Sequence, residues 1–129
     1  MNKKTRIKIY NKYGGHCAYC GKEIAYKDMQ VDHIIPLYRG WDKRRLDGLK
    51  RGDDNISNYN PSCRSCNFRK STMSIEDFRE ELRLQARRIV ERSFQVRQSL
   101  DYGLLSYDDK PIEFYFEKYD ADNHRSGTK

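Results

Sequence analysis

Long apolar runs and prolines are scarce in this 129-residue chain, which has three prolines and a hydrophobic fraction of 36% against 35% charged residues. No stretch approaches the ~20 consecutive apolar residues of a membrane helix, so we expect no membrane contact. The basic N-terminus, MNKKTRIKIY, lacks the apolar core and cleavage site of a signal peptide. We therefore expect a cytoplasmic protein whose thin core needs a further source of stability.

The chain has only four cysteines, and they form two Cys-x-x-Cys pairs. Cys17 and Cys20 make the first pair, Cys63 and Cys66 make the second, and 42 residues separate the pairs. Each pair suits a knuckle that presents two thiolates to one tetrahedral zinc ion. In a reducing compartment such pairs indicate metal ligands rather than disulfides. The sequence therefore predicts one structural Zn²⁺ that stabilises the fold.

Acidic residues are too few to balance the basic ones, and the net charge is +7. Residues 1–70 hold 16 of the 26 Lys and Arg residues but only 7 of the 19 Asp and Glu residues. The positive charge thus lies in the half of the chain that holds the cysteines. Such a field favours a polyanion, with nucleic acid as the first candidate. On charge alone, an ordinary basic surface is the alternative.

The hydrophobic pattern predicts an α+β chain. Ser74 and Asp77 form a capping box that starts an amphipathic helix. Ile112, Phe114 and Phe116 alternate with polar residues, which predicts a half-buried terminal strand before a frayed tail at 120–129. The other expected elements are a short helix in 3–13, a strand in 29–37, a loop over 38–57 and a helix that starts near Cys63.

A second group of residues surrounds the adjacent Asp32 and His33. On a helix that starts near the second cysteine pair, Asn67 points ~100° away from the preceding cysteine. Lys70 lies three residues later on the same face as Asn67. Zinc would hold this helix against the strand that carries Asp32 and His33. This group of residues suits phosphodiester hydrolysis. The side-chain oxygens of Asp32 and Asn67 can bind a hard divalent ion, the His33 imidazole can activate water, and the Lys70 cation can bind phosphate.

The order of these motifs resembles the HNH endonuclease family. Cys-x-x-Cys is followed by Asp-His-Ile-Ile-Pro-Leu and then by Ser-Asn-x-x-Pro-x-Cys-x-x-Cys-Asn-x-x-Lys, over residues 17–71. More narrowly, the chain resembles small free-standing phage and bacterial members with a four-cysteine zinc site. The resemblance implies a ββα-metal (His-Me finger) core over 1–73, in which a hairpin packs on a helix around one catalytic ion. Residues 74–129 would add a helix and a terminal strand to the same domain.

The resemblance also implies a role for each matching residue. His33 would be the general base that takes a proton from water, and Asp32 would hold a catalytic Mg²⁺ or Mn²⁺ ion. Asn67 stands at the third motif position, where His is frequent, and would bind the ion through its amide oxygen. Asn58 would brace the loop and orient the base, although Asn60 is also turn-prone. The expected products are a 5′-phosphate and a 3′-hydroxyl.

The loop over 38–52, YRGWDKRRLDGLKRG, directly follows the strand with Asp32 and His33. We interpret it as a DNA-contacting arm in which Trp41 is available to stack on a base. A solvated charged loop is the alternative. The residues expected to contact DNA are Arg39, Lys43, Arg44, Arg45, Arg69 and Lys70.

The sequence thus predicts a metal-dependent HNH endonuclease that acts on DNA. One alternative is a non-catalytic zinc module that only binds nucleic acid. Another is a structural or partner-binding zinc protein whose acidic C-terminal strand forms an interface. The sequence identifies no phage or host protein partner.

Overall fold

The computed structural model describes residues 1–49 and 51–127 and divides the chain into two compact units. The first unit comprises Met1–Ile75 and Glu113–Lys129, and the second comprises Glu76–Ile112. The predicted functional division after residue 73 stays a prediction. No helix in the described ranges has the length and apolar composition that crossing a membrane requires.

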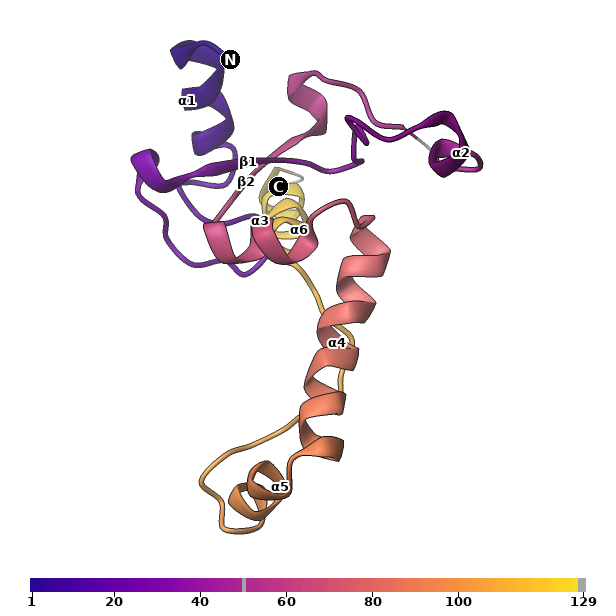
Figure 1. Cartoon of the computed structure of the whole chain (residues 1–129). Helices are drawn as coiled ribbons and strands as arrows, with labels where there is room; N and C mark the ends of the chain where they lie inside the picture. The colour runs from indigo at the N-terminus through magenta and orange to yellow at the C-terminus, as the bar shows by residue number, and fades with distance from the viewer. Residues whose placement is uncertain (50, 128–129) are drawn as a thin grey trace. The chain divides into compact units, whose positions relative to one another are not determined.

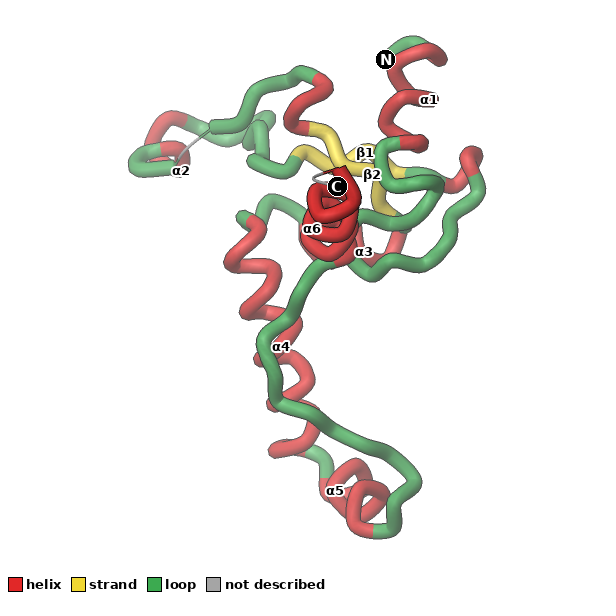
Figure 2. Tube along the Cα trace, turned by 180° about the vertical axis from the view of Figure 1, so that it is seen from behind, coloured by secondary structure: helices red, strands yellow, loops and turns green. Residues whose placement is uncertain are grey.

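The first unit is built on an antiparallel pair of strands, β1 (Gln30–His33) and β2 (Tyr59–Ser62). The strands lie side by side in Figure 1 and are drawn in yellow in Figure 2. Helix α3 (Arg64–Lys70) follows β2 at once and packs against β1. Asp32 lies opposite Asn60 in this register, and His33 lies opposite Tyr59. The predicted α+β class, with a strand pair and a following helix, is confirmed.

Helix α3 begins where the sequence predicts it. Cys63 is the N-cap residue, and its sulfur accepts a hydrogen bond from the backbone N–H of Cys66 at 3.4 Å. A capping side chain satisfies one of the amide groups left open by the first helical turn. The second cysteine pair therefore both starts the helix and presents its thiols at the N-terminal end.

Helix α1 (Lys3–Asn11) confirms the predicted N-terminal helix. The Asn2 side chain caps it by accepting from Thr5 N at 2.8 Å. The Arg6 guanidinium donates to the carbonyl oxygens of Tyr26 and Met29, at 3.0 and 2.9 Å. Arg6 thereby ties α1 to the short 3₁₀ helix η1 (Tyr26–Asp28) and to the residue that precedes β1.

The expected loop between the strands is mostly irregular, with two short helical segments. These are α2 (Lys43–Leu46) and η2 (Ile56–Asn58). The Asp42 side chain starts α2 by accepting from Arg45 N at 3.0 Å. An N-cap aspartate explains why helix forms within this charged segment.

The prediction of a terminal strand is wrong, because residues Tyr115–Gly127 form helix α6. The predicted frayed tail is helical over 120–127, and its last two positions, 128–129, lie outside the described residues. The backbone N–H groups of Tyr115 and Phe116 donate to Tyr19 O and Ala18 O, at 3.1 and 2.8 Å. The Glu117 carboxylate accepts from Phe114 N at 2.9 Å, as in a capping box. The alternation of apolar and polar residues does correctly indicate a buried side chain, since Phe114 is almost fully buried. Local capping and docking on the first cysteine knuckle favour a helix start over strand pairing.

Helix α4 (Ile75–Arg92) starts directly after Ser74 as predicted, and all of it but Ile75 belongs to the second unit. This unit also contains α5 (Phe94–Asp101), which was not predicted. Arg83 and Arg87 bind the two carboxylate oxygens of Asp109, at 3.0 and 2.6 Å. The hydrogen bonds from Arg87 and Arg83 lower the pKa of Asp109 below its ordinary value. They tie the segment after α5 back to α4.

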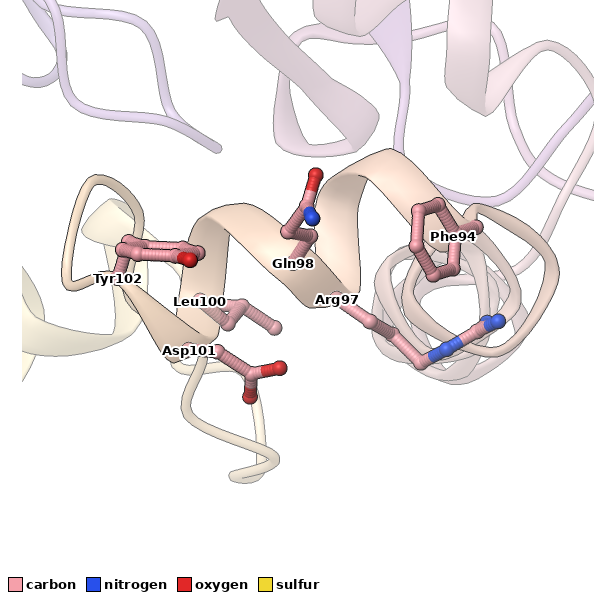
Figure 3. A pocket seen from close by; sticks show the side chains of 6 residues that line it. All are labelled: Phe94, Arg97, Gln98, Leu100, Asp101 and Tyr102. Atoms are coloured by element: carbon pink, nitrogen blue, oxygen red, sulfur yellow. The ribbon is translucent and has the colours of Figure 1, made fainter.

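A shallow hollow on α5 is lined by Phe94 and Tyr102 at opposite ends of the helix, as Figure 3 shows. Both aromatic side chains are exposed. The hollow's charged lining residues are Arg97 and Asp101. It lacks the histidine and cysteine groups on which the predicted chemistry depends, so the candidate site lies in the first unit.

Candidate active site and metal centre

The four cysteines meet in one cluster in the first unit. Their sulfur atoms all lie within 4.8 Å of one another, and Cys20 Sγ is 3.9 Å from Cys63 Sγ. A tetrahedral zinc with ~2.3 Å bonds separates its sulfur ligands by ~3.8 Å, so the cluster fits such an ion. The predicted clustering of Cys17, Cys20, Cys63 and Cys66 is confirmed, and their binding of zinc stays a prediction.

The first knuckle is held by its own backbone and by β2. Cys17 N donates to Lys22 O at 2.8 Å, and Ala18 N donates to Pro61 O at 2.8 Å. Gly21 makes the turn with a φ of +82°, where a Cβ atom would lie 2.8 Å from the Tyr115 ring. Only glycine fits this position without strain. The hydrogen bond to β2 brings cysteines from distant parts of the chain together.

The electrostatics of the cluster favour a thiolate at Cys17. A hydrogen bond from the Cys66 thiol, partly opposed by burial, lowers the pKa of Cys17 to about 4. The same hydrogen bond, together with burial, raises the pKa of Cys66. Thiolate is the form that binds a metal ion.

Asp32 is at the centre of a buried polar network. The Tyr19 hydroxyl donates to Asp32 Oδ2, and Lys70 Nζ lies 3.1 Å from the same oxygen. Lys70 also donates to His33 O at 3.0 Å, which joins α3 to β1. Burial raises the pKa of Asp32, and the Lys70 ammonium acts in the opposite direction.

The prediction that Lys70 binds a DNA phosphate is wrong, because its ammonium group is buried beside Asp32. Its side chain is 0% exposed, whereas a phosphate contact requires an accessible ammonium. Lys70 does share the neighbourhood of Asp32 and His33, as the helical spacing predicts. It serves there as the internal counter-ion of Asp32, because a buried carboxylate needs a charged partner.

His33 is held by a carboxylate that sequence reasoning missed. Its Nε2 lies 3.1 Å from Asp54 Oδ1, and its ring makes a T-shaped contact with the Tyr59 ring at a centroid distance of 5.1 Å. The Tyr59 hydroxyl donates to Asp54 at 2.5 Å, and Arg39 donates to the other oxygen at 2.8 Å. The bonds from Tyr59 and His33 lower the pKa of Asp54. The available signal was an acid four residues before Asn58, in a Gly-Asp-Asp run typical of a turn.

Asn58 braces the segment that leaves β1. Its Nδ2 donates to Ile35 O and Asp53 O, and its Oδ1 accepts from Ile35 N, each at 2.9 Å. Gly52 packs so closely that a Cβ atom there would lie 2.0 Å from Ile35 O. Asn60 is instead buried on β2, with its Oδ1 3.2 Å from Lys12 Nζ. These contacts agree with the bracing role predicted for Asn58, whose effect on catalysis stays a prediction.

Asp32, His33 and Asn67 line one open hollow of ≈ 520 Å³. Asn67 reaches it from α3, and the other two reach it from β1. The structure therefore brings together the three residues predicted to hold a catalytic ion and activate water. Its wall also includes Tyr38, Arg39 and Phe68.

The expected DNA-contacting residues differ in their surroundings. Arg39 lies at the hollow and is 70% exposed, and Arg69 is half-buried on α3. Arg44 is exposed on α2, and the exposed Arg45 guanidinium lies 3.9 Å from the centroid of the Trp41 ring. The side chain of Lys43 lies outside the described residues.

Comparison with protein families gives a match over the segment that carries both sites. The model of the HNH endonuclease family matches residues 17–72. The predicted resemblance to the HNH endonuclease family is confirmed over these residues.

A comparison with solved structures also gives matches to this chain. One similar chain is described as the crystal structure of the Type II-C Cas9 enzyme from Actinomyces naeslundii, at 24% identity and a TM-score of 0.48. The match covers 60% of this chain and 8% of the Cas9 chain. A comparison with curated proteins gives no match.

Proposed function

We propose that this chain is a metal-dependent endonuclease that hydrolyses DNA phosphodiester bonds at the hollow beside β1. The observation that carries the proposal is the common placement of Asp32, His33 and Asn67 around that hollow. An acid, an imidazole and an amide oxygen are the groups that metal-assisted phosphodiester hydrolysis uses. The HNH domain over residues 17–72 supports the same chemistry.

His33 is the general base of the proposed reaction. Its neutral imidazole accepts a proton from a water molecule that attacks the phosphorus in line. The bond to the 3′ oxygen breaks, and that oxygen takes a proton from solvent water, which leaves a 3′-hydroxyl and a 5′-phosphate. The exposed Arg39 at the same hollow is placed to bind a substrate phosphate.

Asp32 and Asn67 would hold the catalytic Mg²⁺ or Mn²⁺ ion. Carboxylate and amide oxygens are hard ligands that suit either ion. A carboxylate has about four lone-pair sites, so the bonds from Tyr19 and Lys70 leave Asp32 able to bind a cation. When bound, such an ion would supply positive charge that stabilises the phosphate and the leaving oxygen.

Structural zinc at the four cysteines is part of the proposal. The cluster has a full tetrahedral set of sulfur ligands, which leaves no open position for substrate. The metal would hold the first knuckle to the start of α3 and thereby fix β1 beside α3. Its contribution is stability and geometry rather than chemistry.

The decisive experiment is a cleavage assay on supercoiled plasmid with purified protein. Cleavage that requires added Mg²⁺ or Mn²⁺ and is lost in a folded His33→Ala variant supports the proposal. A protein that shifts the plasmid in a gel without cutting it would instead be the non-catalytic zinc module. A protein that does neither would be a structural or partner-binding zinc protein.

A further inference from the structure

We propose that Asp54 is the positioning residue of His33: it holds the Nε2–H of the imidazole and directs Nδ1 to the attacking water. The inference rests on the proposed function of His33 as general base. Neutral imidazole has one N–H donor and one nitrogen lone pair, and the partner of the donor determines which nitrogen is the base. Asp54 Oδ1 is 3.1 Å from Nε2, whereas Nδ1 has no hydrogen-bond partner among the described residues.

The Asp54 carboxylate has the charge state that this role needs. Its pKa is lowered by the hydrogen bonds from Tyr59 and His33 and by the charge of Arg39, so it is ionised at neutral pH. An ionised carboxylate only accepts hydrogen bonds. The His33 nitrogen that faces it must therefore carry the proton.

The carboxylate is also held in place from two sides. The Tyr59 hydroxyl donates to Oδ1 at 2.5 Å, and the Arg39 guanidinium donates to Oδ2 at 2.8 Å. Tyr59 is directly opposite His33 in the strand register, and residues so placed share one face of a sheet. The edge contact between the two rings, at 87° between their planes, adds a second restraint on the imidazole.

A simple surface ion pair between Asp54 and Arg39 is the competing explanation, since such pairs contribute little. It does not explain the geometry, because one oxygen of Asp54 serves Arg39 and the other serves His33 and Tyr59. The contact with Arg39 therefore leaves the other carboxylate oxygen to His33 and Tyr59, which an ion pair with Arg39 alone would not require. The chain offers a matched control in the neighbouring Asp53, which is exposed and contacts Asn58 through its backbone oxygen only.

The first test reads the imidazole directly and needs no cleavage. Long-range ¹H–¹⁵N NMR spectra distinguish the two neutral tautomers, and His33→Ala assigns the signals. We expect the Nε2–H tautomer of His33 in the parent and in Asp53→Ala, and a mixture of both tautomers in Asp54→Ala. A predominant Nδ1–H tautomer in the parent, or an unchanged tautomer in Asp54→Ala, would overturn the inference.

The second test separates positioning from binding. Loss of the outer-shell group that orients a metal-binding histidine typically costs ~10–100-fold in activity, and we take the same range for the group that orients His33. We expect a decrease of that order in kcat for Asp54→Ala, with KM unchanged, and substantial recovery in Asp54→Asn, whose amide oxygen still accepts from Nε2–H. Equal kinetics of Asp54→Ala and Asp53→Ala would contradict the inference. A parent protein that never cleaves would refute the nuclease proposal, and the tautomer measurement would still decide the role of Asp54.

Discussion

Lys70 Nζ lies 3.1 Å from a carboxylate oxygen of Asp32, and both side chains are buried. The pair connects the end of α3 with β1, the strand that carries His33. Breaking a buried ion pair by removing one partner is strongly destabilising, because the remaining charge has no compensation. The pair is therefore a structural support of the site as well as a neighbour of the reacting groups.

Lys70→Met should lower the free energy of unfolding by about 3–5 kcal/mol, as measured by urea denaturation. The double variant Asp32→Asn/Lys70→Met should recover part of this loss, because it leaves no isolated charge. Lys27→Met is the matched control, since Lys27 is exposed. Equal stability of Lys70→Met and Lys27→Met would show that the buried pair is not a support.

His33→Ala should reduce plasmid cleavage by ~10²–10⁴-fold, the usual effect of losing a general base. Its zinc content and thermal melting should remain those of the parent, because the His33 side chain bonds only to Asp54 among the described residues. The cleavage rate and the zinc content of His33→Ala and of the parent are measured on the same preparations. A folded variant that cuts at the parental rate would rule out His33 as the base.

Cys63→Ser should abolish stoichiometric zinc binding and sharply lower the melting temperature. Structural zinc contributes ~10–16 kcal/mol of apparent binding free energy, which becomes folding free energy. Cys63 is also the N-cap of α3, but serine is a good N-cap, so the expected loss comes from the metal. Elemental analysis and thermal melting with and without a chelator provide the measurement. A parent protein purified without zinc would contradict the structural role of the metal.

The triple variant Lys43→Ala/Arg44→Ala/Arg45→Ala should weaken DNA binding for all sequences alike. Each lost phosphate contact reduces the slope of log affinity against log salt by ~0.9, so the slope should flatten by up to about two to three units. Fluorescence anisotropy over a salt series measures it, in a His33→Ala background that prevents cleavage. Replacement of the exposed Lys8, Lys22 and Lys27 removes the same charge elsewhere and is the control. Identical slopes for the two triple variants would show that the loop over 38–52 is a solvated charged loop and not a DNA-contacting arm.

Gly52→Ala should destabilise the site although Gly52 has no positive φ. The added Cβ would lie 2.0 Å from Ile35 O and 2.7 Å from Asn58 Nδ2, so backbone must move. Overpacking of this kind costs about 1–3 kcal/mol. Gly40→Ala is the contrast, because its φ is +79° but no atom lies within 4 Å of the new Cβ. Urea denaturation and cleavage assays should show the larger loss for Gly52→Ala, and the reverse order would exclude the close packing around Asn58.

Local spacing made much of the first unit predictable. Two Cys-x-x-Cys pairs specify a four-sulfur cluster wherever the fold brings them together, and that cluster is present. The helical rotation between Cys66 and Asn67 correctly separates the metal centre from the hollow that Asn67 lines. Such features depend on nearest neighbours along the chain, which a sequence displays directly.

The sequence by itself determined the α+β class, the cysteine cluster and the grouping of Asp32, His33 and Asn67. Tertiary structure alone decided that Lys70 is buried, that Asp54 holds His33, and that the C-terminal segment starts helix α6. The burial of Lys70 depends on how α3 packs against β1, and the Asp54 contact joins residues 21 positions apart. A periodic pattern shows which side chains prefer burial, but the partner that covers them is supplied by packing between distant segments.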